Sequence, residues 1–209
     1  MWRDGSAIAC CPMSDDAYPY DFRGIVQHEA GGHGFGKLGD EYTYHNAFIQ
    51  SCDCSCCDHL GSVAFGTGFL GKKALGWYRN LESVGDMEKV GWSHLIFNPK
   101  YSNIVDIYEG GYFHSRGIFR SEPNSCMNNN IPYYSAISRQ EMVERIMRYA
   151  DKEFDINEFY AKDVLDSQGN NTGATRSSVA ETAVTLTGAG KQMPPKFMGD
   201  KPQLKKSNK

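Results

Sequence analysis

The side chains that could carry out chemistry are concentrated between positions 28 and 41. His28 and His33 offer imidazole nitrogens, Glu29 directly follows the first histidine, and Asp40 and Glu41 come shortly afterwards. Histidine and carboxylate groups are common zinc ligands, and a catalytic zinc keeps one coordination position for water beside three protein ligands. A neighbouring carboxylate can take a proton from that water. These residue types therefore indicate a hydrolytic zinc site.

The spacing of the two histidines differs from the helical zinc-peptidase motif His-Glu-x-x-His. His33 follows His28 by five positions instead of four. At about 100° per residue, an offset of four leaves two side chains within roughly 40° of each other, whereas an offset of five separates them by about 140°. Gly31 and Gly32 lie between the histidines and make irregular backbone easy to adopt, so we expect a one-residue π-bulge. The alternative is a glycine-rich turn with unrelated histidines.

Two segments of the chain carry specific patterns. The first runs from His28 to Tyr42 and reads HEAGGHGFGKLGDEY, and the second runs from Phe119 to Asn130 and reads FRSEPNSCMNNN. Together they resemble the bacterial IgA-peptidase family of zinc metallopeptidases, including a branch with an extra glycine between the histidines. In the zincin fold of such enzymes, the second segment turns beneath the metal at a methionine, which is Met127 here. The resemblance covers about residues 8 to 165.

The resemblance implies an α+β, zincin-like endopeptidase domain that is extracellular, attached to the cell surface or periplasmic. We place this domain at 1–167, with the methionine turn at about 124–130. Beyond it the composition shifts to Gly, Asn, Ser, Thr and Lys, which predicts a polar tail over 168–209. Such families place a strand-rich subdomain before the zinc helix, and only 27 residues precede His28. We therefore expect the chain to lack part of that subdomain.

Asp40 and Glu41 are the candidates for the third zinc ligand. Gly34 and Gly36 mark the end of the zinc helix and allow the chain to turn back toward the metal. In related zincins the third ligand follows soon after such a glycine, so we predict that Asp40 binds the metal. Glu41 remains the alternative, because its longer side chain could reach the metal or hydrogen-bond to a histidine.

Local patterns predict the helices that surround this segment. Asp21 can cap an active-site helix at about 21–34, which carries an apolar stripe before His28. A capping box from Ser138 to Glu141 opens a helix at about 139–149. Asp155 opens the last predicted helix, at about 156–165.

A β-hairpin is predicted between these helices. Segments rich in β-branched and aromatic residues, at 104–108 and 112–114, flank Gly110 and Gly111, which is typical of two strands joined by a glycine turn. Trp77 and Trp92 are predicted to pack in the core rather than to bind substrate. Residues 179–186 could add one edge strand.

Three further residues are weaker site candidates. In several zincins a tyrosine just past the methionine donates a hydrogen bond to the oxyanion, so Tyr133 and Tyr134 are candidates for that role. His114 precedes the methionine segment and is a candidate for the substrate cleft. The remaining histidines carry no functional signal: His45, His59 and His94.

Seven cysteines are many for a reduced cytosolic enzyme. A cluster of four stands beside His59: Cys52, Cys54, Cys56 and Cys57. The C-x-x-C spacing within this cluster would suit a structural zinc, but no second ligand pair is evident at a suitable distance. We expect disulfides, with a second zinc as the alternative.

Composition excludes several classes of function. The chain has 209 residues, is 40% hydrophobic and carries a net charge of -3, which suits a globular domain and argues against a nucleic-acid partner. The sequence holds no apolar run long enough to span a membrane, and its first residues lack the apolar core of a signal peptide.

These observations together predict a zinc-dependent endopeptidase. One Zn2+ ion is held by His28, His33 and Asp40, and Glu29 acts as general base toward the attacking water. The substrate is a protein or peptide. The alternative is a catalytically inactive metal-binding or protein-binding module of a secreted or surface protein, in which the extra glycine displaces His33.

Overall fold

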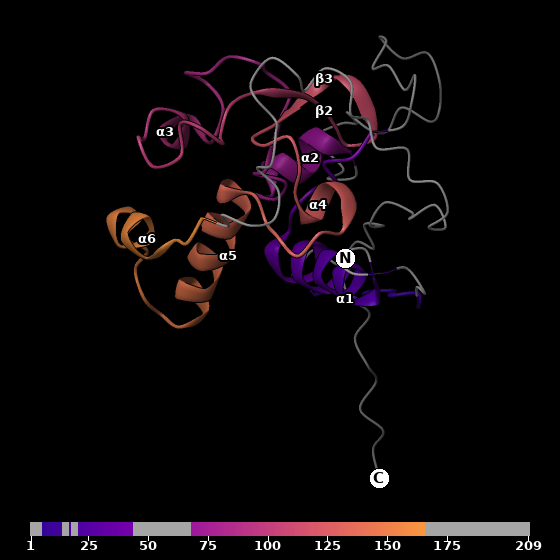
Figure 1. The fold of residues 1–209 in the computed structure, drawn as a ribbon. Helices are drawn as coiled ribbons and strands as arrows, with labels where there is room; N and C mark the ends of the chain where they lie inside the picture. Colours follow the sequence, from indigo (N-terminus) through magenta and orange to yellow (C-terminus); the bar gives the residue numbers. More distant parts are fainter. Residues whose placement is uncertain (1–5, 14–16, 18–20, 44–67, 166–209) are drawn as a thin grey trace.

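Helices and a small antiparallel sheet make up the described part of the chain (Figure 1). The computed structural model describes residues 6–13, 17, 21–43 and 68–165. This mixed architecture confirms the predicted α+β class. The helices are α1 (Phe22–Val26), the π-helix η1 (Gln27–Gly36), α2 (Phe69–Ala74), α3 (Ser93–Ile96), α4 (Cys126–Asn129), α5 (Ala136–Tyr149) and α6 (Ile156–Lys162). The strands are β1 (Leu81–Glu82), β2 (Tyr108–Gly111) and β3 (His114–Arg120).

Several predictions fall outside these residues. They concern the cysteine cluster at 52–57, the histidines His45 and His59, and the polar tail with its candidate strand. Within the described part of the chain, Cys10, Cys11 and Cys126 are free thiols. No helix of that part combines the length and the apolar composition needed to cross a membrane.

The predicted hairpin exists, but its turn lies two residues later than expected. The sheet order is β1-β3-β2 with antiparallel neighbours, and Gly111 pairs with His114. Tyr112 and Phe113 therefore form the turn, with φ values of 47° and 70° that bulky residues seldom adopt. Gly110 lies instead at an irregularity in β2, with a φ of 114°. The predicted position of the turn at Gly110 and Gly111 was wrong.

Contacts from another segment explain why aromatic residues occupy this turn. The Tyr112 amide donates a hydrogen bond to the Asp40 carbonyl at 2.8 Å, and the Phe113 amide donates to the Tyr42 carbonyl at 3.1 Å. Both rings belong to a buried aromatic cluster that also includes Tyr42 and Tyr78. Tertiary packing thus determines the position of the turn. In return, the hairpin restrains the backbone of the residues that follow η1.

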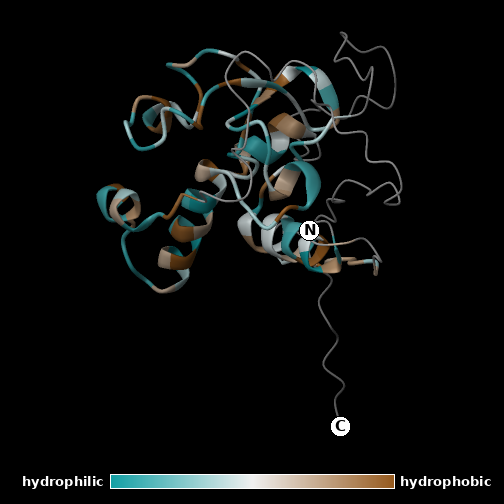
Figure 2. Cartoon of the chain, in the orientation of Figure 1, coloured by the Kyte–Doolittle hydropathy of each residue, from teal (hydrophilic) through white to brown (hydrophobic). Residues whose placement is uncertain are grey.

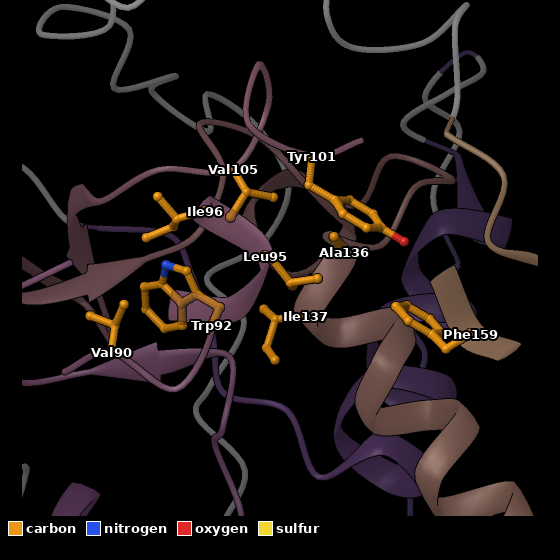
Figure 3. Packing of buried hydrophobic residues seen from close by; sticks show 9 residues of the cluster. All are labelled: Val90, Trp92, Leu95, Ile96, Tyr101, Val105, Ala136, Ile137 and Phe159. Atoms are coloured by element: carbon orange, nitrogen blue, oxygen red, sulfur yellow. The ribbon is translucent and has the colours of Figure 1, made fainter. Parts of the chain in front are cut away.

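A second hydrophobic cluster lies away from the aromatic cluster. Figure 3 shows its nine side chains: Trp92 and Leu95 lie near Ile137 of α5, and Phe159 of α6 lies at the other end, near Tyr101. The Trp92 indole nitrogen donates to the Asp106 carbonyl at 2.9 Å, which satisfies its polar group inside the core. This cluster joins α3, α5 and α6. The predictions that Trp77 and Trp92 are buried core residues are confirmed.

The two late helices are confirmed, with a correction to each. Asp155 caps α6 as predicted, because its carboxylate accepts from the Asn157 amide at 2.8 Å, although the helix ends at Lys162 instead of 165. Helix α5 begins at Ala136, so the predicted capping box at Ser138 was wrong. Ser138 is buried within the helix, and Figure 2 shows hydrophobic and hydrophilic residues alternating along it.

A distant carboxylate takes the role of the predicted cap of α5. The Glu122 side chain accepts a hydrogen bond from the Ala136 amide at 2.6 Å and another from the Tyr133 hydroxyl at 2.7 Å. Burial raises the pKa of this carboxyl to about 7, although the Ala136 and Tyr133 hydrogen bonds and nearby Arg139 favour its charged form. The start of α5 is thereby tied to the segment that precedes the methionine turn.

This arrangement predicts that the stability of the folded protein falls as the pH rises. Glu122→Gln should make the stability less dependent on pH. Folding raises the carboxyl pKa from 4.5 to about 7, so its contribution to stability is complete below pH 4.5 and is lost as the pH rises through 7. The amide can still accept from Ala136 and does not ionise. Between about pH 5 and 8, the variant should gain up to roughly 3 kcal/mol of unfolding free energy relative to wild type.

Urea denaturation at several pH values measures this difference. Glu153→Gln, which removes an exposed carboxylate, serves as the control and should follow the wild-type profile. Parallel profiles for Glu122→Gln and wild type would refute the prediction.

Candidate metal centre

The helix that carries the two histidines begins as predicted and then changes geometry. The Asp21 carboxylate accepts from the Arg23 amide at 3.1 Å and caps α1. From Gln27 to Gly36 the backbone forms a π-helix of 10 residues, which is longer than the predicted one-residue bulge. Because hydrogen bonds in a π-helix join residues five positions apart, His28 and His33 come to lie on the same face. Their ring centroids are 4.8 Å apart.

The end of η1 turns the chain back toward the histidines. Lys37 adopts a φ of 58°, and the amides of Lys37 and Leu38 both donate to the Gly32 carbonyl. The helix thus ends at Gly36, two residues beyond the predicted end at about 34, and a lysine makes the left-handed turn. Asp40 then returns to the same face as the histidines.

Three ligand atoms meet at one buried point. His28 Nε2 lies 3.1 Å from His33 Nε2, and each of these nitrogens lies 3.0 Å from Asp40 Oδ1. All three side chains are buried. These three residues form a group that could hold a metal ion.

The hydrogen bonds of the two Nδ1 atoms determine which imidazole nitrogens face this point. His28 Nδ1 donates to the Cys126 carbonyl at 2.9 Å, and His33 Nδ1 donates to the Leu38 carbonyl at 2.8 Å. Because a carbonyl oxygen can only accept, each neutral ring carries its proton on Nδ1 and presents an Nε2 lone pair. Two such lone pairs and a carboxylate oxygen repel one another unless a metal ion or a proton lies between them.

The dimensions of the group suit zinc. Nitrogen and oxygen ligands lie about 2.0 to 2.2 Å from zinc, and at tetrahedral angles two of them are about 3.3 Å apart. Asp40 Oδ2 is also buried and accepts no hydrogen bond from the described residues. A cation would compensate both the three facing acceptors and this second oxygen, so the donor set fits a divalent metal.

Charge interactions within the group also favour positive charge at this point. Burial opposes ionisation of Asp40, but His33 and His28 outweigh burial and hold the pKa of its carboxyl well below the usual range. Burial likewise opposes protonation of His33, but Asp40 outweighs burial and raises its pKa. The Asp40 carboxylate thus stabilises positive charge at the point where the ligand atoms meet.

Glu29 is half-buried beside this group. Burial raises the pKa of its carboxyl above the ordinary value, and the charges of His33 and His28 oppose this rise. Glu29 thus lies within electrostatic reach of both histidines. A carboxylate whose affinity for protons is increased next to a metal site is suited to general-base chemistry.

The structure separates the two candidates for the third ligand. Glu41 is buried but turns away from the histidines: its Oε2 accepts from Ser125 Oγ at 2.5 Å and its Oε1 accepts from Asn80 Nδ2 at 2.8 Å. Its backbone amide donates to the Met127 carbonyl at 2.8 Å. Asp40 is therefore the carboxylate that accompanies the histidines, and Glu41 links the ligand segment to the methionine segment.

The methionine segment packs directly against η1. Met127 is fully buried, and a β-carbon placed on Gly32 would lie 2.2 Å from its sulfur. Ser125 caps the short helix α4 by accepting from the Met127 amide at 3.1 Å. Cys126, which lies directly before Met127, supplies the carbonyl that orients His28. This segment thus supports the metal group through both its side chain and its backbone.

Among the weaker site candidates, the two tyrosines hydrogen-bond to other groups. The Tyr133 hydroxyl donates to Glu122, and the Tyr134 hydroxyl donates to the Gln27 carbonyl at 2.5 Å, so the geometry gives no support to an oxyanion role for either. His114 is buried at the start of β3. His94 bonds to Gln140 at 2.7 Å, consistent with a structural histidine.

The sequence analysis missed Asn80. It is fully buried and hydrogen-bonds to the backbone on the N-terminal side of Asp40 and to the side chain of Glu41. A single asparagine before a short strand has no pattern that marks it, since its role depends on a segment about forty positions earlier.

No protein-family model matches the chain, and no curated protein matches it.

Truncation of each carboxylate tests the assignment of the third ligand. Asp40→Ala should empty the metal group, because it removes a ligand atom. Glu41→Ala should reduce metal affinity by only about 10- to 100-fold, which is typical for the loss of a supporting partner. Metal content after dialysis against zinc measures both, and full zinc retention by Asp40→Ala would move the ligand assignment to Glu41.

A pair of glycine substitutions tests the contact between η1 and Met127. Gly32→Ala places a methyl group against the methionine sulfur, and such overpacking costs about 1 to 3 kcal/mol. Gly34→Ala is the matched control, because its nearest neighbour would be the Glu29 carbonyl oxygen at 3.3 Å. We expect lower stability and weaker zinc binding for Gly32→Ala alone. Equal thermal midpoints and zinc affinities for the two variants would show that Met127 does not restrict this helix.

Proposed function

We propose that this protein is a zinc-dependent endopeptidase of the zincin type, similar to the bacterial IgA-peptidase family and active outside the cytosol. The observation that carries the proposal is the convergence of two Nε2 lone pairs and one carboxylate oxygen at a buried point. The peptide substrate and the location come from the resemblance of the two sequence segments.

The order of parts along the chain also supports the proposal. A helix with two histidines ends in a reversal, a carboxylate returns to the histidines, and a methionine segment packs beneath the helix. The structure adds a reason for the extra glycine, since the π-helix restores a common face to histidines five positions apart. The longer spacing is therefore compatible with metal binding, and displacement of His33, as the inactive-module alternative requires, is not needed.

His28, His33 and Asp40 would hold the metal. Zinc, when bound, supplies Lewis-acid chemistry that lowers the pKa of a water toward about 7 and polarises a carbonyl. The two backbone carbonyls keep the imidazoles in the tautomer that presents Nε2. The buried Asp40 carboxylate contributes negative charge and offsets part of the charge of the cation.

Glu29 would move the proton. Its carboxylate accepts a proton from the attacking water, which makes the oxygen nucleophilic toward the scissile carbonyl. The carboxylic acid so formed donates the proton to the leaving amine. Partial burial favours this cycle, because it brings the proton affinity of the carboxylate closer to that of the groups with which it exchanges the proton.

Glu29→Gln separates the enzyme from an inactive binding module. The variant should retain zinc, because Glu29 is not one of the converging residues, and should lose about 10²- to 10⁴-fold in cleavage of an unstructured protein such as casein. Zinc content and cleavage are measured on the same samples, with chelator-treated and zinc-restored wild type as controls. Equal residual cleavage in wild type and variant, or a wild type without zinc, would favour the binding module.

A further inference from the structure

The residues on both sides of Asp40 are held by one side chain. Asn80 Oδ1 accepts from the Gly39 amide at 2.8 Å, and Asn80 Nδ2 donates to the Gly39 carbonyl at 2.9 Å. The same Nδ2 donates to Glu41 Oε1 at 2.8 Å. Asn80 directly precedes β1 and is fully buried, so solvent does not compete for these bonds.

The Asp40 carboxylate itself has little that orients it. Its Oδ1 lies against the two histidines, and its Oδ2 accepts no hydrogen bond from the described residues. In many metal sites, hydrogen bonds to a carboxylate ligand fix its position. Here the position of the carboxylate depends on the backbone that carries it.

We infer that Asn80 is the positioning residue for the third metal ligand, an inference that rests on the proposed function of the His28, His33 and Asp40 group. Asn80 fixes the peptide before Asp40 directly and the residue after it through Glu41. It thereby sets the direction in which the Asp40 side chain leaves the backbone. Asn80 makes no contact with the reacting atoms and acts through Asp40.

The chemistry of these three bonds requires an asparagine. One planar amide must both accept from an N–H group and donate two hydrogen atoms to different oxygens. An aspartate can accept but cannot donate when ionised, and its second oxygen would face the Gly39 carbonyl and the Glu41 carboxylate. A glutamine has the same groups but is one carbon longer, which a fully buried site does not accommodate without movement.

Other groups hold the same segment but cannot replace Asn80. The Tyr112 amide donates to the Asp40 carbonyl, and the Glu41 amide donates to the Met127 carbonyl, both at 2.8 Å. These bonds restrain the peptide after Asp40. The Gly39 peptide before it is hydrogen-bonded by Asn80. Loss of Asn80 should therefore leave the segment in place and loosen the ligand.

Asn80→Asp is the isosteric test, and zinc affinity is its first readout. Competition with a chromogenic chelator should show a loss of about 10- to 100-fold relative to wild type. Substitution with Co2+ supplies the second readout, because its visible absorption bands respond to the arrangement of the ligands. We expect weaker and shifted bands for the variant at saturating Co2+. Leu95→Ala, in the Trp92 cluster, is the control for general loss of stability and should keep wild-type affinity and spectrum.

A double variant provides the rescue. In Asn80→Asp combined with Glu41→Gln, the amide introduced at position 41 can donate to the carboxylate introduced at position 80, so the direction of this hydrogen bond is reversed. Part of the lost zinc affinity and of the Co2+ spectrum should return. Recovery in the double variant, compared with each single variant, shows coupling between the two positions that simple loss of folding does not produce.

The outcomes are distinguishable. Wild-type protein that binds no zinc would overturn the proposed function itself. Wild type that binds zinc, with Asn80→Asp matching it in affinity and spectrum, would overturn only the positioning role. If Asn80→Asp weakens binding no more than Leu95→Ala does and Glu41→Gln gives no rescue, Asn80 serves the fold alone, and the inference fails.

Discussion

The five-residue hydrogen-bond repeat of η1 is the constraint on which the rest of the site depends. In a regular α-helix His28 and His33 would point apart, and neither Asp40 nor the methionine segment could bring them together. The repeat also places Gly31 and Gly32 against Tyr134 and Met127, where a side chain would collide. The glycines thus have two roles, since they permit the π-helix and allow the methionine segment to approach it closely.

The charged and polar groups around the metal group form a buried network. Carbonyls of Cys126 and Leu38 orient the histidines, and the Ser125–Glu41–Asn80 chain of hydrogen bonds supports Asp40. Such groups lose hydration on burial, so each needs a partner inside the protein. The three facing acceptors and Asp40 Oδ2 are the exceptions in this network, and a bound cation would compensate them.

Local signals in the sequence predicted the parts that local interactions determine. The caps at Asp21 and Asp155 and the end of η1 all depend on residues within a few positions of one another. The return of Asp40 to the histidines was also predicted, although distant contacts with Asn80 and Met127 support it. The hairpin turn at Tyr112 and the start of α5 depend instead on distant partners. Asn80 belongs to this second group. No local pattern shows which segment will lie opposite, so these features could not be predicted from the chain alone.

The aromatic turn at Tyr112 and Phe113 couples the hairpin to the ligand segment. Left-handed backbone at residues other than glycine costs about 1 to 3 kcal/mol each and persists only where the surroundings compensate it. The compensation comes from Asp40, Tyr42 and the aromatic cluster. An isolated hairpin peptide would therefore not hold this turn, and the turn and the ligand segment must become ordered in the same cooperative step. The place where a metal can bind thus exists only when chain segments that are distant in sequence are packed together.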